Sequence, residues 1–100
     1  MYTQKQIIDF ISENRTFLSK NFHVSKIGLF GSYARNEQTM KSDIDLIIDF
    51  EKNTDDLFDL KIGIKKFFKE NLNIAVDICR EKYIKPSFKK RIEYEAIFIS

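Results

Sequence analysis

The chain has few of the residues that build disulfide, zinc and histidine-based sites. Its 100 residues include one cysteine, Cys79, one histidine, His23, and no tryptophan. A single cysteine excludes an internal disulfide and a cysteine-based zinc site. The lone histidine argues against a histidine-dependent catalytic triad or a histidine-rich metal site. Three glycines and one proline leave no room for a flexible linker or a low-complexity tract.

Long hydrophobic runs are also missing. No apolar stretch approaches the roughly 20 residues of a membrane span. The N-terminal segment MYTQKQIIDFISENR lacks the apolar core of a signal peptide. We therefore expect a cytoplasmic protein that does not engage a membrane. With 43% hydrophobic and 32% charged residues, a chain of this length is expected to form one globular domain with a modest core.

The net charge of +2 gives no general argument for nucleic-acid binding, so direct binding to nucleic acid is not expected. The distribution of charge is more informative. Acidic residues dominate from Asp43 to Asp59, and basic residues dominate from Arg80 to Arg91. This asymmetry favours a site that handles cations and an anionic substrate together, although two solvated faces of opposite sign remain an alternative.

The hydrophobic pattern predicts a series of alternating helices and strands. Helices are expected over about 3–21, from near Thr54 to 71–73, and from Pro86 to about Ile97. Strands are expected over Val24–Phe30, Ile44–Phe50 and Ile74–Cys79, with a short helical turn at 32–35. This order predicts an α/β or α+β fold with a small central sheet of about three strands.

Most of the phenylalanines are expected in the core. Because ten of them exceed what so small a core easily buries, some are expected to cover a partner interface. The residues assigned to the core are Phe10, Phe17, Phe22, Phe58, Phe67, Phe68, Phe88 and Phe98.

Three carboxylates fall on predicted strands or at their start: Asp43, Asp45 and Asp77. Residues i and i+2 of a strand point to the same face, so Asp43 and Asp45 can approach one cation together. Asp77 lies among apolar residues, where an ionised carboxylate is costly unless it is paired or bound to a metal. Oxygen ligands favour Mg²⁺. The structural alternatives are a turn cap at Asp43, a solvated Asp45, and an ion pair of Asp77 with Arg80 or a neighbouring lysine.

A second feature is the Gly31-Ser32 pair that follows the first predicted strand. Glycine permits a close approach of the backbone, and the free N–H groups at the start of a helix attract anions. The serine hydroxyl adds a donor. The pair is therefore a candidate phosphate cradle beside the carboxylates, although such a pair on its own is more often a simple turn.

Together these residues match a known signature. Gly31-Ser32, ten intervening residues and Asp43-Ile44-Asp45 resemble the GS-x10-D-x-D signature of the DNA polymerase β-like nucleotidyltransferases. The strings GLFGSYAR and SDIDLIIDF resemble the minimal nucleotidyltransferase group, many of whose members are antitoxins paired with HEPN toxins. The resemblance implies a single minimal nucleotidyltransferase domain over residues 1–100, with a small mixed sheet. Asn36 departs from the glycine common in relatives, and asparagine tolerates the left-handed backbone that this position is expected to need.

The resemblance also implies roles for individual residues. Asp43 and Asp45 would hold two Mg²⁺ ions, and Asp77 would be the third metal-binding carboxylate and help to deprotonate the attacking hydroxyl. Gly31 and Ser32 would contact the phosphates of ATP, with Arg35 as a further phosphate ligand. The implied reaction is AMP transfer from ATP to a hydroxyl, expected on a tyrosine of a partner HEPN ribonuclease toxin. A non-catalytic antitoxin that acts by binding, and a nucleotidyltransferase for a small molecule, remain alternatives.

Overall fold

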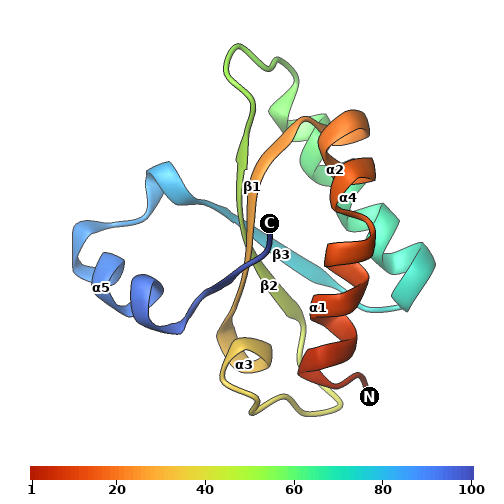
Figure 1. Ribbon diagram of the computed structural model, residues 1–100, viewed down its shortest axis with the longest axis vertical. Helices are drawn as coiled ribbons and strands as arrows, with labels where there is room; N and C mark the ends of the chain where they lie inside the picture. The colour runs from red at the N-terminus through yellow and green to blue at the C-terminus, as the bar shows by residue number, and fades with distance from the viewer.

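A computed structural model describes all of residues 1–100 and places a four-stranded mixed sheet at the centre of the fold (Figure 1). The strands follow the order β3-β2-β1-β4. β1 pairs antiparallel with both β2 and β4, and β2 pairs parallel with β3. Their bounds are Val24–Phe30 for β1, Ile44–Phe50 for β2, Val76–Arg80 for β3 and Ile97–Phe98 for β4. The predicted α+β class is confirmed.

The predicted count of three strands is wrong, because the last residues of the chain form β4. The expected C-terminal helix ends at Glu95, and Ala96 already has an extended backbone with ψ of 140°. Ile97 then packs against the core beside Leu29, whereas Phe98 lies on the opposite face beside Gly28. Two residues are too few to show strand alternation in the sequence, and Ile97 also fits the apolar stripe of the preceding helix.

The helices divide between the two faces of the sheet. α1, α2 and α4 cover one face, α5 lies beyond the other, and the short α3 follows β1 at one end (Figure 1). The bounds are Gln4–Glu13 for α1, Arg15–Phe22 for α2, Gly31–Ala34 for α3, Leu57–Leu72 for α4 and Pro86–Glu95 for α5, with a 3₁₀ turn, η1, at Glu81–Tyr83. None of these helices is long and apolar enough to cross a membrane.

The helix expected over about 3–21 begins as predicted but is broken into two. Thr3 Oγ1 accepts a hydrogen bond from the Gln6 N–H, and Gln6 Oε1 accepts one from the Thr3 N–H, which forms the predicted capping box. The break falls at Asn14, whose side-chain amide donates to the carbonyl of Phe10 at 2.8 Å. Asparagine favours such local bonds to the backbone over continued helix.

The core lies between the sheet and the α1, α2 and α4 layer. Alternate residues of β2 face this core, and the intervening residues face the side of α5. The core-facing residues of β2 are Ile44, Leu46, Ile48 and Phe50. The acidic residues Asp45 and Asp49 therefore share the opposite face, which we call the outer face, with the buried Ile47.

The assignment of most phenylalanines to the core is only partly right. Phe68 is fully buried, but Phe58 is 75% exposed and Phe88 is 47% exposed. Phe58 lies in the first turn of α4, beside the exposed Asp59. Phe88 belongs to α5, which contributes no buried residue. Helical spacing alone did not distinguish a face that meets the sheet from one that meets solvent.

Candidate active site

Gly31 places the backbone directly against a carboxylate of the neighbouring strand. It ends β1 and begins α3 with φ of +72°, a conformation that side chains other than glycine's rarely adopt. A Cβ added to Gly31 would overlap Oδ2 of Asp45. The backbone at Gly31 therefore lies against the side chain of Asp45, one of the predicted site acids.

Ser32 and Arg35 follow Gly31 on a turn that is anchored to the rest of the fold. Tyr33, between them, is 1% exposed in the core. Gln4 Nε2 of α1 donates to the carbonyls of Tyr33 and Ala34 at 3.0 and 2.9 Å. The buried Tyr33 side chain and the two Gln4 hydrogen bonds hold the turn in place, with Ser32 half-buried beside Gly31. The Ser32 hydroxyl makes no hydrogen bond within the chain. The hydroxyl is therefore available to a ligand.

The predicted carboxylates are brought together by the pairing of β2 with β3. Asp45 and Asp77 lie directly opposite each other in this parallel register, and Asp45 also lies opposite Phe30, the residue before Gly31. Asp43 precedes β2 by one residue and is exposed. The sequence indicated the spacing of Asp43 and Asp45, but only the sheet shows that Asp77 is the neighbour of Asp45.

The three acids have no directly paired cation. None of the three forms an ion pair or a hydrogen bond within the chain, and the alternative pairing of Asp77 with Arg80 is wrong, because Arg80 pairs with Asp49. Burial raises the pKa of Asp45, and the charges of Asp77 and Asp43 raise it further. The guanidinium of Arg35 acts in the opposite direction and lowers the pKa of Asp45. Like charges held close together favour a bound cation.

The acids do not form a closed set of metal ligands. No group of three or more His, Cys, Asp or Glu side chains lies close enough to hold a metal ion together. The crowded, unpaired carboxylates of Asp43, Asp45 and Asp77 nevertheless fit Mg²⁺ in their chemistry. This ion binds through one or two carboxylates, keeps several waters and completes its shell with substrate phosphates.

Arg35 is occupied by acidic partners. Its Nε lies 2.9 Å from Oε1 of Glu37, and its Nη1 lies 2.9 Å from Oε1 of Glu95 at the end of α5. These carboxylates raise the pKa of Arg35, with Glu95 the larger cause. Glu95 was not among the site residues predicted from the sequence. Glu95 lies four residues after Arg91, a spacing that predicts an ion pair along a helix. No sequence pattern connects Glu95 with Arg35, which lies 60 residues earlier.

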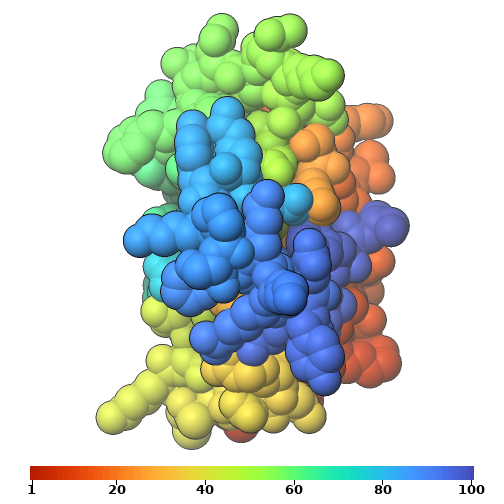
Figure 2. Space-filling view, turned by 90° about the vertical axis from the view of Figure 1, so that its left-hand side faces the viewer, coloured from red at the N-terminus to blue at the C-terminus, as the bar shows by residue number.

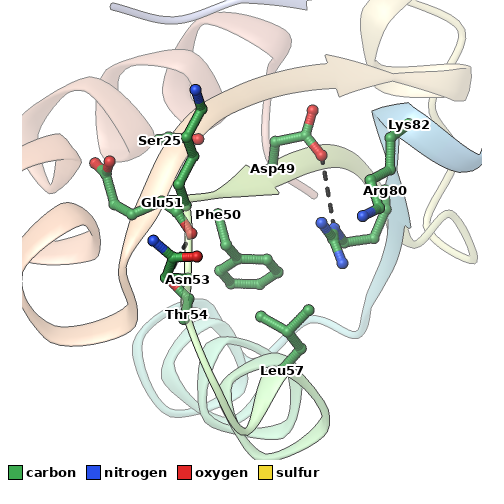
Figure 3. Close-up of a pocket in the computed structure, with 10 residues that line it drawn as sticks. Ser25, Asp49, Phe50, Glu51, Asn53, Thr54, Leu57, Arg80 and Lys82 are labelled. Carbon is green, nitrogen blue, oxygen red and sulfur yellow. Dashed lines mark hydrogen bonds and ion pairs between the residues drawn. The ribbon is translucent and has the colours of Figure 1, made fainter.

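A separate cavity lies at the opposite end of β2, at the loop that follows it. Asp49 Oδ1 and Arg80 Nε are 3.5 Å apart at this cavity, beside Phe50 and Leu57 (Figure 3). The cavity is lined by Ser25, Asp49, Phe50, Glu51, Lys52, Asn53, Thr54, Leu57, Arg80 and Lys82. Asp49 lies four positions after Asp45 along the strand, or about 13 Å away. The lining of this cavity does not include the predicted site residues.

Figure 2 shows the outer face of the molecule. The C-terminal segment lies across its middle, and the segment that follows β1 forms its lower end. The predicted site belongs to this lower end, where Gly31 and the beginning of β2 meet.

Comparison with known proteins identifies the family to which this chain belongs. The Nucleotidyltransferase domain family matches residues 11–99. The chain belongs to this family. The match includes all six of the predicted site residues, Gly31, Ser32, Arg35, Asp43, Asp45 and Asp77.

Similar nucleotidyltransferases are known from archaea. Two proteins of Methanocaldococcus jannaschii assigned as protein adenylyltransferases, MJ1379 and MJ0128, are 34% and 38% identical to this chain. In both cases the match covers 99% of this chain and 100% of the relative. The protein adenylyltransferase MntA of Thermococcus cleftensis is 28% identical over 99% of this chain and 98% of its own length.

Solved structures resemble the nucleotidyltransferase fold described here. A protein assigned as a minimal nucleotidyltransferase superposes with a TM-score of 0.77 and 25% identity, covering 96% of this chain and 95% of its own. A chain from a toxin–antitoxin crystal structure with AMP-PNP superposes with a TM-score of 0.63 and 18% identity, covering 97% of this chain and 72% of its own. The second likeness is one of fold alone.

Proposed function

We propose that this nucleotidyltransferase transfers AMP from ATP to a hydroxyl of a protein partner, and that the partner is the toxin of a toxin–antitoxin pair. The observation that carries the proposal is the contact of the Gly31 backbone with Asp45, beside Asp77 and Asp43. It supports the proposal because the glycine turn adjoins acids that have no ion-pair partner. Support comes from the relatives named protein adenylyltransferase and from the fold shared with a chain of a toxin–antitoxin structure.

Each site residue has a role in this proposal. Gly31 and Ser32 bind the phosphates of ATP through the backbone and the free hydroxyl. Asp43 and Asp45 would hold two Mg²⁺ ions, with Asp77 as the third carboxylate. When bound, Mg²⁺ would supply neutralisation of the charge on the reacting phosphate. Arg35 supplies positive charge for the phosphates.

The proposed chemistry is a single displacement at the α-phosphorus of ATP. The acceptor hydroxyl oxygen forms the new bond to phosphorus, and the bond to the bridging oxygen of pyrophosphate breaks. A carboxylate oxygen of Asp77 accepts the proton of the attacking hydroxyl. We expect this hydroxyl to belong to a tyrosine of a HEPN ribonuclease in the cytoplasm, whose nuclease activity the modification silences.

The experiment uses radiolabelled ATP, Mg²⁺ and the product of the neighbouring gene. We expect label on that partner with the unaltered chain, and a loss of about 100-fold or more with Asp43→Ala or Asp45→Ala, since these acids stabilise transition-state charge. Asp55→Asn, an exposed loop acid outside the site, is the matched control and should leave transfer unchanged. Label transfer that survives both site variants contradicts the assignment of Asp43 and Asp45.

The same variants distinguish catalysis from neutralisation by binding alone. Cells that express the partner are protected by an enzyme only while its acids are present. A variant without Asp43, Asp45 and Asp77 should therefore lose protection although it still binds the partner. Protection retained in this variant, without any label on the partner, supports an antitoxin that acts by occlusion instead. Label on a small-molecule acceptor and none on the partner supports the third alternative.

A further inference from the structure

An ion pair connects the predicted site with the far end of the chain. Glu95 is the last residue of α5, and its Oε1 lies 2.9 Å from Nη1 of Arg35, which follows α3. The side chain of Glu95 is 9% exposed, whereas that of Arg35 is 35% exposed. The contact therefore combines a nearly buried carboxylate with a guanidinium at the edge of the site.

Glu95 has no equivalent second partner. Its Oε2 is buried and accepts no hydrogen bond, and the nearest other cation is Nε of Arg91, at 3.8 Å. A buried carboxylate that loses its cation is strongly unfavourable. Breaking the ion pair would leave the Glu95 carboxylate buried without a close cation. Glu95 therefore restrains the side chain of Arg35.

This contact is also the place where α5 is tied to the site. α5 contributes no buried residue. A cavity separates its middle from the sheet, with Lys89 and Ile92 of the helix on one side and Lys26 and Phe98 of the sheet on the other. The position of Glu95 is set instead by β4, which begins two residues later and pairs with β1.

The guanidinium of Arg35 keeps one edge free. Glu37 occupies Nε and Glu95 occupies Nη1, and Nη2 makes no hydrogen bond within the chain. Glu37 is 66% exposed and contributes the weaker restraint. The charge of Arg35 reaches the acid cluster, because it acts on Asp45.

We infer that Glu95 is a positioning residue, which fixes the guanidinium of Arg35 so that its free Nη2 is presented to the phosphates of a nucleotide at Gly31 and Ser32. This inference rests on the proposed function. An arginine that is already immobilised loses less conformational entropy when it binds an anion, and the planar fork of the guanidinium is suited to phosphate oxygens. Glu95 thereby strengthens phosphate binding without touching the nucleotide.

The experiment compares Glu95→Gln with Glu95→Met. Both remove the same charge and keep the length of the side chain, but only glutamine retains an oxygen that accepts the Arg35 hydrogen bond. Binding of tripolyphosphate and of a non-hydrolysable ATP analogue, each with Mg²⁺, is measured by calorimetry. We expect the Met variant to bind both probes about two- to tenfold more weakly than the Gln variant, which is the effect of freeing one long side chain.

Two controls separate positioning from a structural role of α5. Glu93 is exposed on the same helix and makes no ion pair, so Glu93→Gln and Glu93→Met should bind equally. With Arg35→Ala added to both Glu95 variants, their difference should disappear. A difference that persists without Arg35, or equal binding by the two variants in its presence, overturns the inference.

A measurement without nucleotide adds a direct test. The NMR relaxation of the Arg35 Nε–H group should show a more mobile side chain in the Met variant than in the Gln variant, and Glu95→Ala provides a second variant without an acceptor. Equal mobility in all three overturns the inference. If the unaltered chain binds neither probe, the proposed function and this inference fail together. Normal binding with no difference at Glu95 contradicts the inference alone.

Discussion

Gly31 is the residue on which the geometry of the site depends most. It combines φ of +72° with a carboxylate where a Cβ would stand. Gly28 lies three residues earlier, within β1, and a Cβ there would meet the ring of Phe98 at 2.7 Å. The two positions differ in what a Cβ would require. At Gly28 the Phe98 ring, which is 41% exposed, can move away, whereas at Gly31 the positive φ itself disfavours any side chain.

We predict that Gly31→Ala lowers the free energy of unfolding by about 1–3 kcal/mol. It should also weaken nucleotide binding, because Asp45 or the backbone of residue 31 must move. Gly28→Ala is the matched control and should cost less in urea denaturation. Adding Asp45→Ala to Gly31→Ala should restore part of the lost free energy of unfolding, since it removes the carboxylate that the new Cβ overlaps. If Asp45→Ala restores no free energy of unfolding, the backbone conformation of residue 31 alone causes the destabilisation.

At the scale of the element, β2 carries acids with different roles at its two ends. Asp45 meets the glycine turn at the beginning of the strand, two residues after Asp43, and Asp49 pairs with Arg80 near the end of the strand. Arg80 is 9% exposed and lies over the rings of Phe50 and Tyr83. The pair at the end of β2 is structural, because it compensates a cation that the fold has buried.

We predict that Asp49→Ala destabilises the chain by about 1–3 kcal/mol, because it leaves the guanidinium of Arg80 without its carboxylate. Nucleotide affinity should be unchanged. Asp43→Ala should have the opposite profile, with stability within about 0.5 kcal/mol of the unaltered chain and weaker nucleotide binding. Urea denaturation and calorimetry measure the two properties separately. A loss of nucleotide binding in Asp49→Ala would show that the two ends of β2 are coupled.

At the scale of the whole molecule, the stabilising core and the unpaired acids lie on opposite faces of one sheet. α1, α2 and α4 bury the core face, whereas the acids lie unpaired on the outer face beside the thin layer made by α5 (Figures 1 and 2). The core that stabilises the fold does not include the three acids, and their like charges are ones that a bound metal would relieve.

We predict that Mg²⁺ raises the melting temperature of the unaltered chain and that EDTA reverses this gain without unfolding it. A ligand present at 100 times its dissociation constant stabilises a protein by about 2.7 kcal/mol, provided it binds only the native state. The gain should vanish in the double variant Asp43→Asn with Asp45→Asn. It should persist when the exposed loop acids Asp55 and Asp56 are changed to asparagine. Equal gains in the two double variants would place the cation elsewhere.

Much of the fold was predictable because it depends on neighbours in sequence. The capping box at Thr3, the proline in the first turn of α5 and the left-handed Asn36, with φ of 58°, follow from local backbone chemistry. The errors fall where long-range packing decided the outcome. β4 has only two residues, and pairing with β1 determines it. Exposed Phe88 fits the apolar stripe of α5, and exposed Phe58 adjoins the apolar stripe of α4, but no layer covers either ring.

The sequence by itself determined that Gly31, Ser32, Asp43 and Asp45 would be candidates, because glycine freedom and strand alternation act over a few residues. Only the tertiary structure decided that Asp77 lies opposite Asp45 and that Glu95 holds Arg35. These contacts join residues separated by tens of positions. They depend on sheet register and on the path of the chain to β4, and no local pattern encodes either of these.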